Sequence, residues 1–255
     1  MSAFAGWRVV VTGAGSGMGA EAARRFAREG AHVVVSDIDE AAAASVAREI
    51  GPAAMGVRCD VSSACECAAL VAAAEGFFSG AIDVFLANAG VSYAGNFLDA
   101  TPESLQRVID INVTGSVFSA QAALRSLVKS PRASLIFTSS ISGVTARAQR
   151  SVYNASKHAL GGLVKSLALE FGPAGVRVNA IAPGATDTSF LRAHLAKVND
   201  DVDAAVGKIV AGMPLGRLVT PEDFADAAVY LASPAARSVT GHTLLLDCGA
   251  SAGRM

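Results

Sequence analysis

Seven short runs of apolar and β-branched residues, separated by helical segments, organise this sequence. They occupy 8–12, 32–36, 55–59, 83–87, 134–138, 176–181 and 243–246. Strands that alternate with helices from one end of a chain to the other are typical of a doubly wound sheet with right-handed crossovers. No linker or internal repeat interrupts the 255 residues. We therefore expect a single α/β domain over 1–255, with a mainly parallel seven-stranded sheet flanked by helices on both faces.

A glycine-rich turn over 13–19 joins the first strand to a helix expected over 20–29. Glycines let a backbone approach a pyrophosphate closely, and the free N–H groups of a helix N-terminus bind an anion. The turn therefore predicts a dinucleotide site, although a plain tight turn fits it as well. Asp37 follows the second strand, where a carboxylate can bind the adenosine ribose and repel a 2′-phosphate, or simply favour the next helix N-terminus. Neither lysine nor arginine stands beside Asp37, which favours NAD over NADP.

Three side chains suited to proton transfer lie further along the chain. Ser140 follows the fifth strand, and Tyr153 and Lys157 stand four residues apart in a helix expected over 151–171. Residues at this spacing share a helix face, and a nearby ammonium favours the phenolate. The pair therefore predicts a tyrosine that acts as acid or base at neutral pH, while Ser140 polarises a carbonyl. A packed phenol and a solvated amine would give the same spacing.

Small and polar residues recur where the other strands end. Asp60-Val61 follows the third strand, Asn88-Ala89-Gly90 the fourth, and a turn over 183–188 the sixth. Ligands of doubly wound folds bind at this edge of the sheet. Asn88 could instead be a turn former. Asn112 lies among apolar residues within a helix expected from 102 towards 129, where it predicts either a structural bridge or part of a proton path.

Composition narrows the range of functions. Hydrophobic residues make up 52% and charged residues 17%, and the net charge of −1 gives no electrostatic reason to bind nucleic acid or an anionic membrane. No apolar run is long enough to span a bilayer, and no secretory signal precedes the first strand, so we expect a cytoplasmic protein. Four cysteines and four histidines lack metal-site spacing, which predicts reduced thiols and no metal.

Taken together, these motifs resemble the short-chain dehydrogenases/reductases, NAD(P)-dependent enzymes with a Rossmann fold. The resemblance covers about 6–249 in the family's order: Thr12-Gly13-xxx-Gly17-x-Gly19, Asp60-Val61, Asn88-Ala89-Gly90, Asn112, Ser140, Tyr153-xxx-Lys157 and Pro183-Gly184-xxx-Thr188. It implies that Tyr153 is the catalytic acid or base and that Ser140 binds the substrate oxygen. By the same resemblance, Lys157 lowers the pKa of Tyr153 and binds the nicotinamide ribose, while Asn112 holds a water that links the lysine to solvent.

The resemblance also implies a set of cofactor contacts. The residues expected to bind NAD are Gly13, Ser16, Gly17, Met18, Gly19, Asp37, Asp60, Val61, Asn88, Ala89, Gly90, Tyr153, Lys157, Pro183, Ala185, Thr186 and Thr188. Two positions depart from the family pattern. Ala87 stands where a second asparagine is frequent, which puts local packing in doubt. Cys248 stands where glycine is common, which puts a subunit contact in doubt.

Residues 187–215 match the family's variable segment and are expected to form a lid over the substrate, or else ordinary helix core. Their apolar residues are Phe190, Leu191, Leu195, Val198, Val206, Ile209, Val210, Met213 and Leu215. Because this segment and Val91, Tyr93 and Val144 offer few charges, we expect a largely apolar secondary alcohol or ketone as substrate. Arg147 and Arg150 would indicate an anionic substrate, although loop arginines are commonly solvated.

The sequence therefore predicts an oxidoreductase that transfers a hydride between NAD(H) and a small alcohol or ketone. A sugar-nucleotide epimerase or dehydratase also uses tyrosine and lysine at this spacing, but the chain length and glycine pattern disfavour it. A catalytically silent NAD-binding regulator is the alternative outside enzymes. Ala155, Ala159 and Gly162 are small residues that allow close packing on one side of the Tyr153 helix. Because the family that the chain resembles is often tetrameric, these residues predict a homotetramer.

Overall fold

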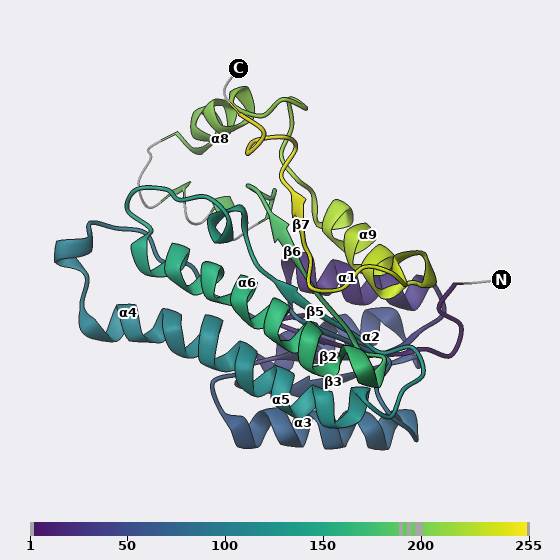
Figure 1. Ribbon diagram of the computed structural model, residues 1–255. Helices are drawn as coiled ribbons and strands as arrows, with labels where there is room; N and C mark the ends of the chain where they lie inside the picture. Colours follow the sequence, from purple (N-terminus) through teal and green to yellow (C-terminus); the bar gives the residue numbers. More distant parts are fainter. Residues whose placement is uncertain (1–2, 189–190, 193–194, 197–200, 254–255) are drawn as a thin grey trace.

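One parallel sheet of seven strands forms the centre of the molecule (Figure 1). The computed structural model describes residues 3–188, 191–192, 195–196 and 201–253, and within them the strand order is β3-β2-β1-β4-β5-β6-β7. The strands are β1 (Arg8–Thr12), β2 (His32–Asp37), β3 (Ala54–Arg58), β4 (Val84–Ala87), β5 (Ser134–Thr138), β6 (Arg177–Pro183) and β7 (Thr243–Leu246). Each neighbouring pair is parallel. The predicted doubly wound α/β fold is confirmed.

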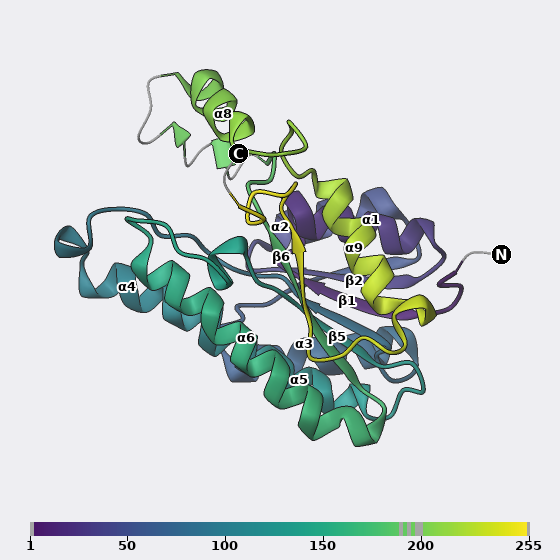
Figure 2. The ribbon, with the colours of Figure 1, turned by 45° about the horizontal axis from the view of Figure 1, so that its top comes forward.

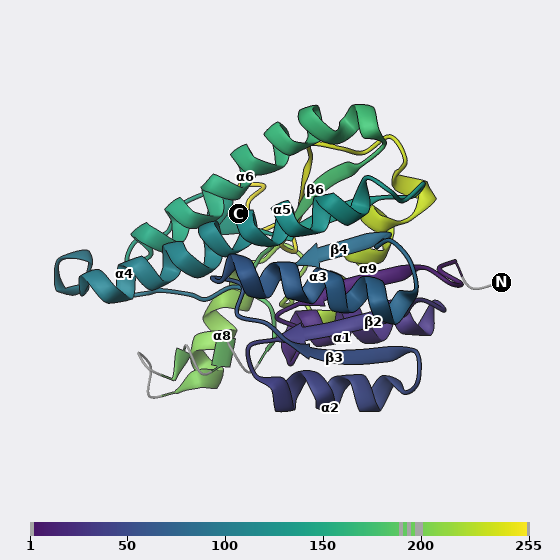
Figure 3. The ribbon, with the colours of Figure 1, turned by 90° about the horizontal axis from the view of Figure 1, so that it is seen from below.

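Helices cover both faces of this sheet. On one face lie α1 (Gly17–Arg28), α2 (Glu40–Ile50) and α9 (Pro221–Ala232), with α1 and α9 side by side (Figure 2). The other face carries α3 (Ala64–Phe78), α5 (Gly115–Leu127) and α6 (Ser151–Phe171) in a row (Figure 3). α4 (Pro102–Ile109) precedes α5, and α8 (Val202–Ala211) lies beyond the two helical layers (Figure 1). Short 3-10 turns occupy Phe97–Asp99, Ile141–Gly143, Gly172–Ala174 and Pro234–Ala236.

Successive residues of the central strands pack into two separate cores. Val9 and Val11 of β1 belong to the core beneath α1, α2 and α9, whereas Val10 belongs to the core beneath α3, α5 and α6. A strand covered on both faces needs apolar side chains at consecutive positions. This explains why the strand runs read as continuous Val-rich segments and not as alternating ones.

Local signals define where the helices begin. Thr101 caps α4 and Pro102 occupies its first position, as predicted. Ser63 caps α3, which begins at Ala64. The helix expected to continue unbroken from 102 is interrupted by a π-helical turn over Asp110–Thr114, which separates α4 from α5. Such turns are frequent at functional sites, and this one contains Asn112.

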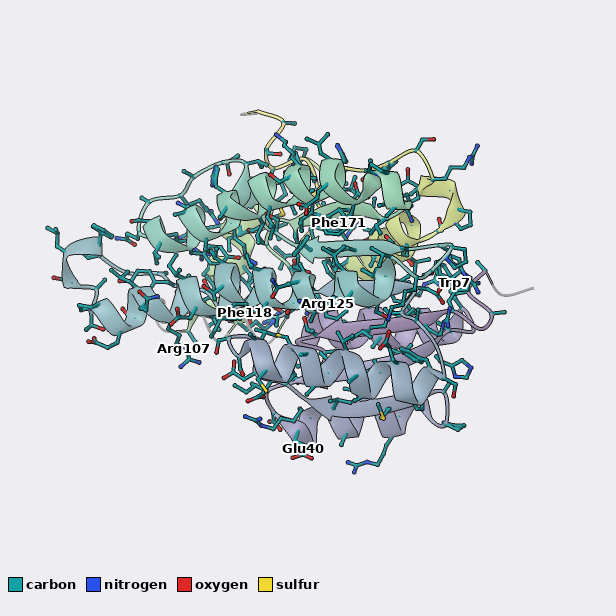
Figure 4. All side chains as sticks on the ribbon, turned by 60° about the horizontal axis from the view of Figure 1, so that its bottom comes forward. Trp7, Glu40, Arg107, Phe118, Arg125 and Phe171 are labelled. Atoms are coloured by element: carbon teal, nitrogen blue, oxygen red, sulfur yellow. The ribbon has the colours of Figure 1, made fainter. Side chains whose placement is uncertain are left out.

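A groove runs between α3 and α5. Phe118 and Arg125 of α5 lie beside α3 (Figure 4), and the groove they help to line has a volume of about 300 Å³. Val117 and Val128, at 40% exposure each, leave apolar surface on the same helix and at its end. The main cavity lies elsewhere, at the carboxyl ends of the strands.

Candidate active site

A cavity of about 750 Å³ extends along the carboxyl ends of the strands. Its lining includes all seventeen residues predicted to bind the cofactor, together with Ser140. They reach one cavity because every strand is parallel and each therefore ends at the same edge of the sheet. Asn112 is the one predicted site residue outside the lining, and it is fully buried behind the cavity.

The glycine turn packs too closely for side chains. Gly13 has a φ of +61°, and a Cβ on Gly19 would lie 2.3 Å from the Gly13 carbonyl oxygen. Asn88 holds this turn, because its Nδ2 donates to the carbonyl oxygens of Thr12 and Gly13, both at 3.0 Å. Its Oδ1 accepts a hydrogen bond of 3.0 Å from the Thr138 hydroxyl. Asn88 is therefore a bridge between β1, β4 and β5, and more than a turn former.

Asp37 ends β2 with its carboxylate in the cavity. One oxygen accepts from the Gly15 N–H at 2.9 Å and the other from the Asp39 N–H at 3.1 Å. Asp39 caps α2 by accepting a hydrogen bond from the Ala42 N–H at 3.0 Å. These bonds fix the Asp37 carboxylate against the glycine turn.

The third strand brings Asp60 and Val61 to the same end of the cavity. One Asp60 oxygen accepts from the Ser62 hydroxyl at 2.7 Å and from its N–H at 2.9 Å, which lowers the pKa of Asp60. Val61 packs so tightly that a Cβ on Gly115 would lie 2.8 Å from one of its methyl carbons. This pair therefore forms a rigid wall.

Ser140, Tyr153 and Lys157 meet as the spacing predicted. The Ser140 hydroxyl lies close enough to the Tyr153 phenol to act on its pKa, and the Ser140 oxygen accepts a hydrogen bond from the Ser142 N–H at 3.1 Å. Lys157 Nζ donates to the Thr138 carbonyl oxygen at 2.8 Å and lies 5.9 Å from the centre of the Tyr153 ring. The side chains of Tyr153 and Lys157 come from the first two turns of α6, which begins at Ser151.

The pKa of Tyr153 shifts opposite to the prediction. Burial raises the pKa of its phenol, and the opposing effects of the Ser140 hydrogen bond and the Arg150 charge are smaller. Burial also lowers the pKa of Lys157 from 10.5 to about 8. The sequence predicted a lowered pKa through Lys157, but burial has the largest effect on the phenol, and the Ser140 hydrogen bond and the Arg150 charge only partly oppose it.

Asn112 forms a structural bridge. Its Nδ2 donates to the Val91 carbonyl at 2.9 Å and to the Ser156 hydroxyl at 3.1 Å, while its Oδ1 accepts from the Val91 N–H at 2.8 Å. The side chain thus ties the segment after β4 to α6. A Cβ on Gly90 would lie 3.2 Å from Asn112 Oδ1 and 3.4 Å from Lys157 Nζ, so these three residues are close neighbours.

The turn after β6 is held in place by β-type pairing and its own hydroxyls. Thr186 pairs with Val219, and the Thr186 and Thr188 hydroxyls donate to the carbonyl oxygens of Gly184 and Thr186 at 3.2 and 3.4 Å. Pro183 ends β6, and Ala185 packs against the neighbouring apolar cluster. Cys248, in the same cluster, has a φ of +53°, a conformation that explains why glycine is common there.

The variable segment contributes side chains both to the cavity lining and to a small apolar cluster. Leu191, Leu195 and Ile209 line the cavity, and Val206, Val210 and Met213 belong to a small core cluster. Leu191 and Ile209 belong to both sets. Leu215 is 66% exposed. Phe190 and Val198 lie outside the described residues.

The cavity lining also contains residues that the sequence did not select. Ser92, Gln149 and Lys208 line the cavity with Val91, Arg147 and Arg150, whereas Tyr93 and Val144 are absent from its described lining. Gln149 has a φ of +63°. Glutamine has no particular preference for this left-handed conformation, so the sequence did not predict it. Among the described residues, no helix is sufficiently long and apolar for a membrane span.

Comparisons with known proteins match the same stretch of chain. A family model described as "Enoyl-(Acyl carrier protein) reductase" matches residues 13–251. Cis-4-hydroxycyclohexanecarboxylate dehydrogenase of Sinomonas cyclohexanicum is 39% identical over 253 residues, 98% of each chain. 3beta-hydroxysteroid dehydrogenase 1 of Eggerthella lenta is 39% identical over 249 residues, 96% of this chain and 93% of the relative. The structure of 3-ketoacyl-(acyl-carrier-protein) reductase from Brucella melitensis complexed with NADH has a TM-score of 0.89 and 33% identity, covering 97% of this chain and 99% of the other.

The family model spans nearly the whole chain, and the relatives are dehydrogenases and reductases of alcohol and ketone groups. Their alignment over almost the full length of both chains includes the cavity described above. The resemblance drawn from the motifs is confirmed. This chain belongs to the short-chain dehydrogenase/reductase family and is an oxidoreductase of alcohols and ketones.

Proposed function

We propose that this protein transfers a hydride between NAD(H) and a secondary alcohol or ketone, with Tyr153 as the acid or base. The observation that carries the proposal is the contact between the Ser140 hydroxyl and the Tyr153 phenol inside the cavity that the glycine turn lines. Two hydroxyls that converge on one point can both bind a single substrate oxygen.

The residues at the other end of the cavity fit a dinucleotide. α1 begins at Gly17, and the preceding Ser16 makes no capping bond through its side chain, so N–H groups of the first turn remain available to a pyrophosphate. A Cβ at Gly13 or Gly19 would fill the space around this turn. Asp37 is positioned for the adenosine ribose and would repel a 2′-phosphate, so we propose NAD in preference to NADP.

When bound, the nicotinamide supplies the hydride acceptor or donor. The chain supplies the proton path. Because burial raises the pKa of Tyr153, the phenol is protonated at neutral pH and can donate to a carbonyl oxygen during reduction. Ser140 would orient that oxygen, and the Lys157 ammonium would hold the nicotinamide ribose. Asn112 would act from behind the lysine, by holding a water or by fixing Val91.

We also retain the expectations about assembly and substrate. Ala155, Ala159 and Gly162 form an exposed row of small residues on α6, which supports close packing in a homotetramer. Residues 187–215 would serve as the lid, with Leu191, Leu195 and Ile209 as its apolar inner face. The proposed setting is the cytoplasm, with a small, largely apolar alcohol or ketone as substrate. Light scattering that gave a monomer would refute the tetramer.

The test is a panel of secondary alcohols and ketones, assayed with NAD and NADP by the absorbance of the reduced nicotinamide. Tyr153→Phe should lower kcat by about 100-fold or more while NADH still binds, as followed by its fluorescence. Turnover that survives this substitution would overturn the proposed role of Tyr153. NADH binding without turnover of any panel member would favour the regulatory alternative.

A further inference from the structure

We infer that the substrate carries a carboxylate, which is held by the positive charges of Arg147 and Lys208 in the lining of the cavity. This inference rests on the proposed function, because it concerns the substrate of the same site. It narrows the expected apolar alcohol or ketone to a hydroxy acid or keto acid with an apolar body.

The charges along the cavity are distributed unevenly. Its described lining contains two carboxylates, Asp37 and Asp60, and both follow strands at the adenosine end. Arg107 belongs to that end as well, because its charge acts on Asp60. Arg147, Arg150 and Lys208 line the remaining part, where the described residues include no carboxylate. A cavity wall with charge of one sign attracts ligands of the opposite sign.

Arg147 and Lys208 have no acidic partner among the residues that the structure describes. Within the described part of the chain, neither Arg147 nor Lys208 forms an ion pair, whereas Arg192, close to α8 in sequence, pairs with Asp187 and Asp203. Arg147 also lies close enough to Arg150 for its charge to lower the pKa of that guanidinium, after the larger effect of burial.

The loop that presents the arginines is held in an unfavourable conformation. Gln149 adopts a φ of +63°, which non-glycine residues rarely adopt. The Gly95 N–H donates to the Gln149 carbonyl at 2.9 Å, and Asn154 Nδ2 donates to the Arg147 carbonyl at 2.9 Å. These bonds fix the backbone on both sides of Gln149. Strained residues that neighbouring elements hold in place are concentrated at ligand-binding sites.

Apolar side chains line the same cavity. They include Val91, Leu191, Leu195 and Ile209, beside the polar Ser92 and Gln149. They suit a hydrocarbon body between the reacting oxygen at Tyr153 and an anionic group at the rim. Arg147 comes from the loop before α6 and Lys208 from α8, so a carboxylate would engage two elements far apart in sequence.

The test compares matched substrates. The panel contains 4-hydroxypentanoate, 5-hydroxyhexanoate and 6-hydroxyheptanoate, each with its primary amide, assayed with NAD. For at least one pair, the wild type should prefer the acid by about tenfold or more in kcat/KM, mainly through KM. Arg147→Gln combined with Lys208→Gln should bring that ratio close to one. Arg48→Gln, which removes an exposed arginine of α2 outside the cavity, should keep the wild-type ratio.

A binding measurement separates this inference from the proposed function. Hexanoate cannot be oxidised as an alcohol, yet it should raise the melting temperature of the wild-type protein saturated with NAD, and hexanamide should not. The double variant should lose the effect. Amides that react as well as acids, or hexanoate that stabilises no better than hexanamide, would overturn the inference while leaving NAD-dependent alcohol oxidation intact. Absence of turnover with hexanoate binding preserved would overturn the proposed function alone.

Discussion

The buried amine of Lys157 should make the stability of this protein depend on pH in a particular direction. Its side chain is 4% exposed, and burial lowers its pKa from 10.5 to about 8. Its hydrogen bond to the Thr138 carbonyl does not offset the lost hydration. Keeping the proton on Lys157 at neutral pH therefore costs folding free energy.

The sign and size follow from proton linkage. Below about pH 8 both the folded and the unfolded chain hold the proton, and the full cost applies. Between about 8 and 10.5 the unfolded chain keeps a proton that the folded chain has released, so the folded state gains stability as the pH rises. Each tenfold change in the proton affinity corresponds to about 1.4 kcal/mol, so the gain between pH 7 and pH 10 is about 2 to 3 kcal/mol.

Lys157→Met removes this titration while keeping a side chain of similar length. It also leaves the Thr138 carbonyl without its donor, at a cost of about 1 to 3 kcal/mol that does not vary with pH. The decisive quantity is therefore the difference in free energy of unfolding between variant and wild type, measured in urea at pH 7, 8.5 and 10. That difference should move in favour of the wild type by about 2 to 3 kcal/mol as the pH rises.

Lys165→Met controls for the loss of an amine, because it removes an exposed lysine from the same helix. A difference between Lys157→Met and wild type that stays constant from pH 7 to pH 10 would refute the reasoning. It would mean that the folded chain holds the Lys157 proton as tightly as the unfolded chain does.

Three further substitutions test how the cavity is built. Asn88→Ala removes the donor to Thr12 and Gly13 and the acceptor for Thr138, and should lower the free energy of unfolding in urea by about 3 kcal/mol; a loss below about 1 kcal/mol would contradict its bridging role. Gly19→Ala places a Cβ 2.3 Å from the Gly13 oxygen and should weaken NADH binding, followed by fluorescence titration, by about tenfold or more. Gly76→Ala, which meets nothing within 4 Å, is its control, and equal affinity of the two variants would argue against a tight glycine turn. Asp37→Asn keeps the shape but removes the charge, and should reduce the preference for NAD over NADP in kcat/KM by about tenfold; an unchanged ratio would show that Asp37 does not select the cofactor.

The predictions that held depend on sheet topology. Once β1, β2, β4, β5 and β6 are recognised as parallel strands, the residues after them must meet at one edge, whatever their separation in sequence. This is why Gly13, Asp37, Asn88 and Ser140 could be assigned to one cavity without coordinates. The spacing of Tyr153 and Lys157 works in the same way, because helix geometry alone places both on one face.

The predictions that failed depend on burial, which arises from contacts across the fold. The direction of the Tyr153 pKa shift required knowledge of how completely the phenol is removed from water. The π-helical turn at Asp110–Thr114 has no composition signal, and its residue Asn112 is fixed by Val91 and Ser156 from other elements. Helical periodicity predicts a regular helix wherever apolar residues recur, so it could not locate this interruption.

The cations at the substrate end show why the substrate itself was the hardest property to predict. From the sequence, Arg147 in a loop and Lys208 in a helix are each best interpreted as surface residues in contact with solvent. For either residue alone that interpretation is sound. Their significance depends on both lining one apolar-walled cavity in which Asp37 and Asp60 lie at the opposite end. The charge of a binding site is set by all the side chains that line it in the folded protein. In this cavity, a carboxylate ligand would balance the positive charges of Arg147 and Lys208.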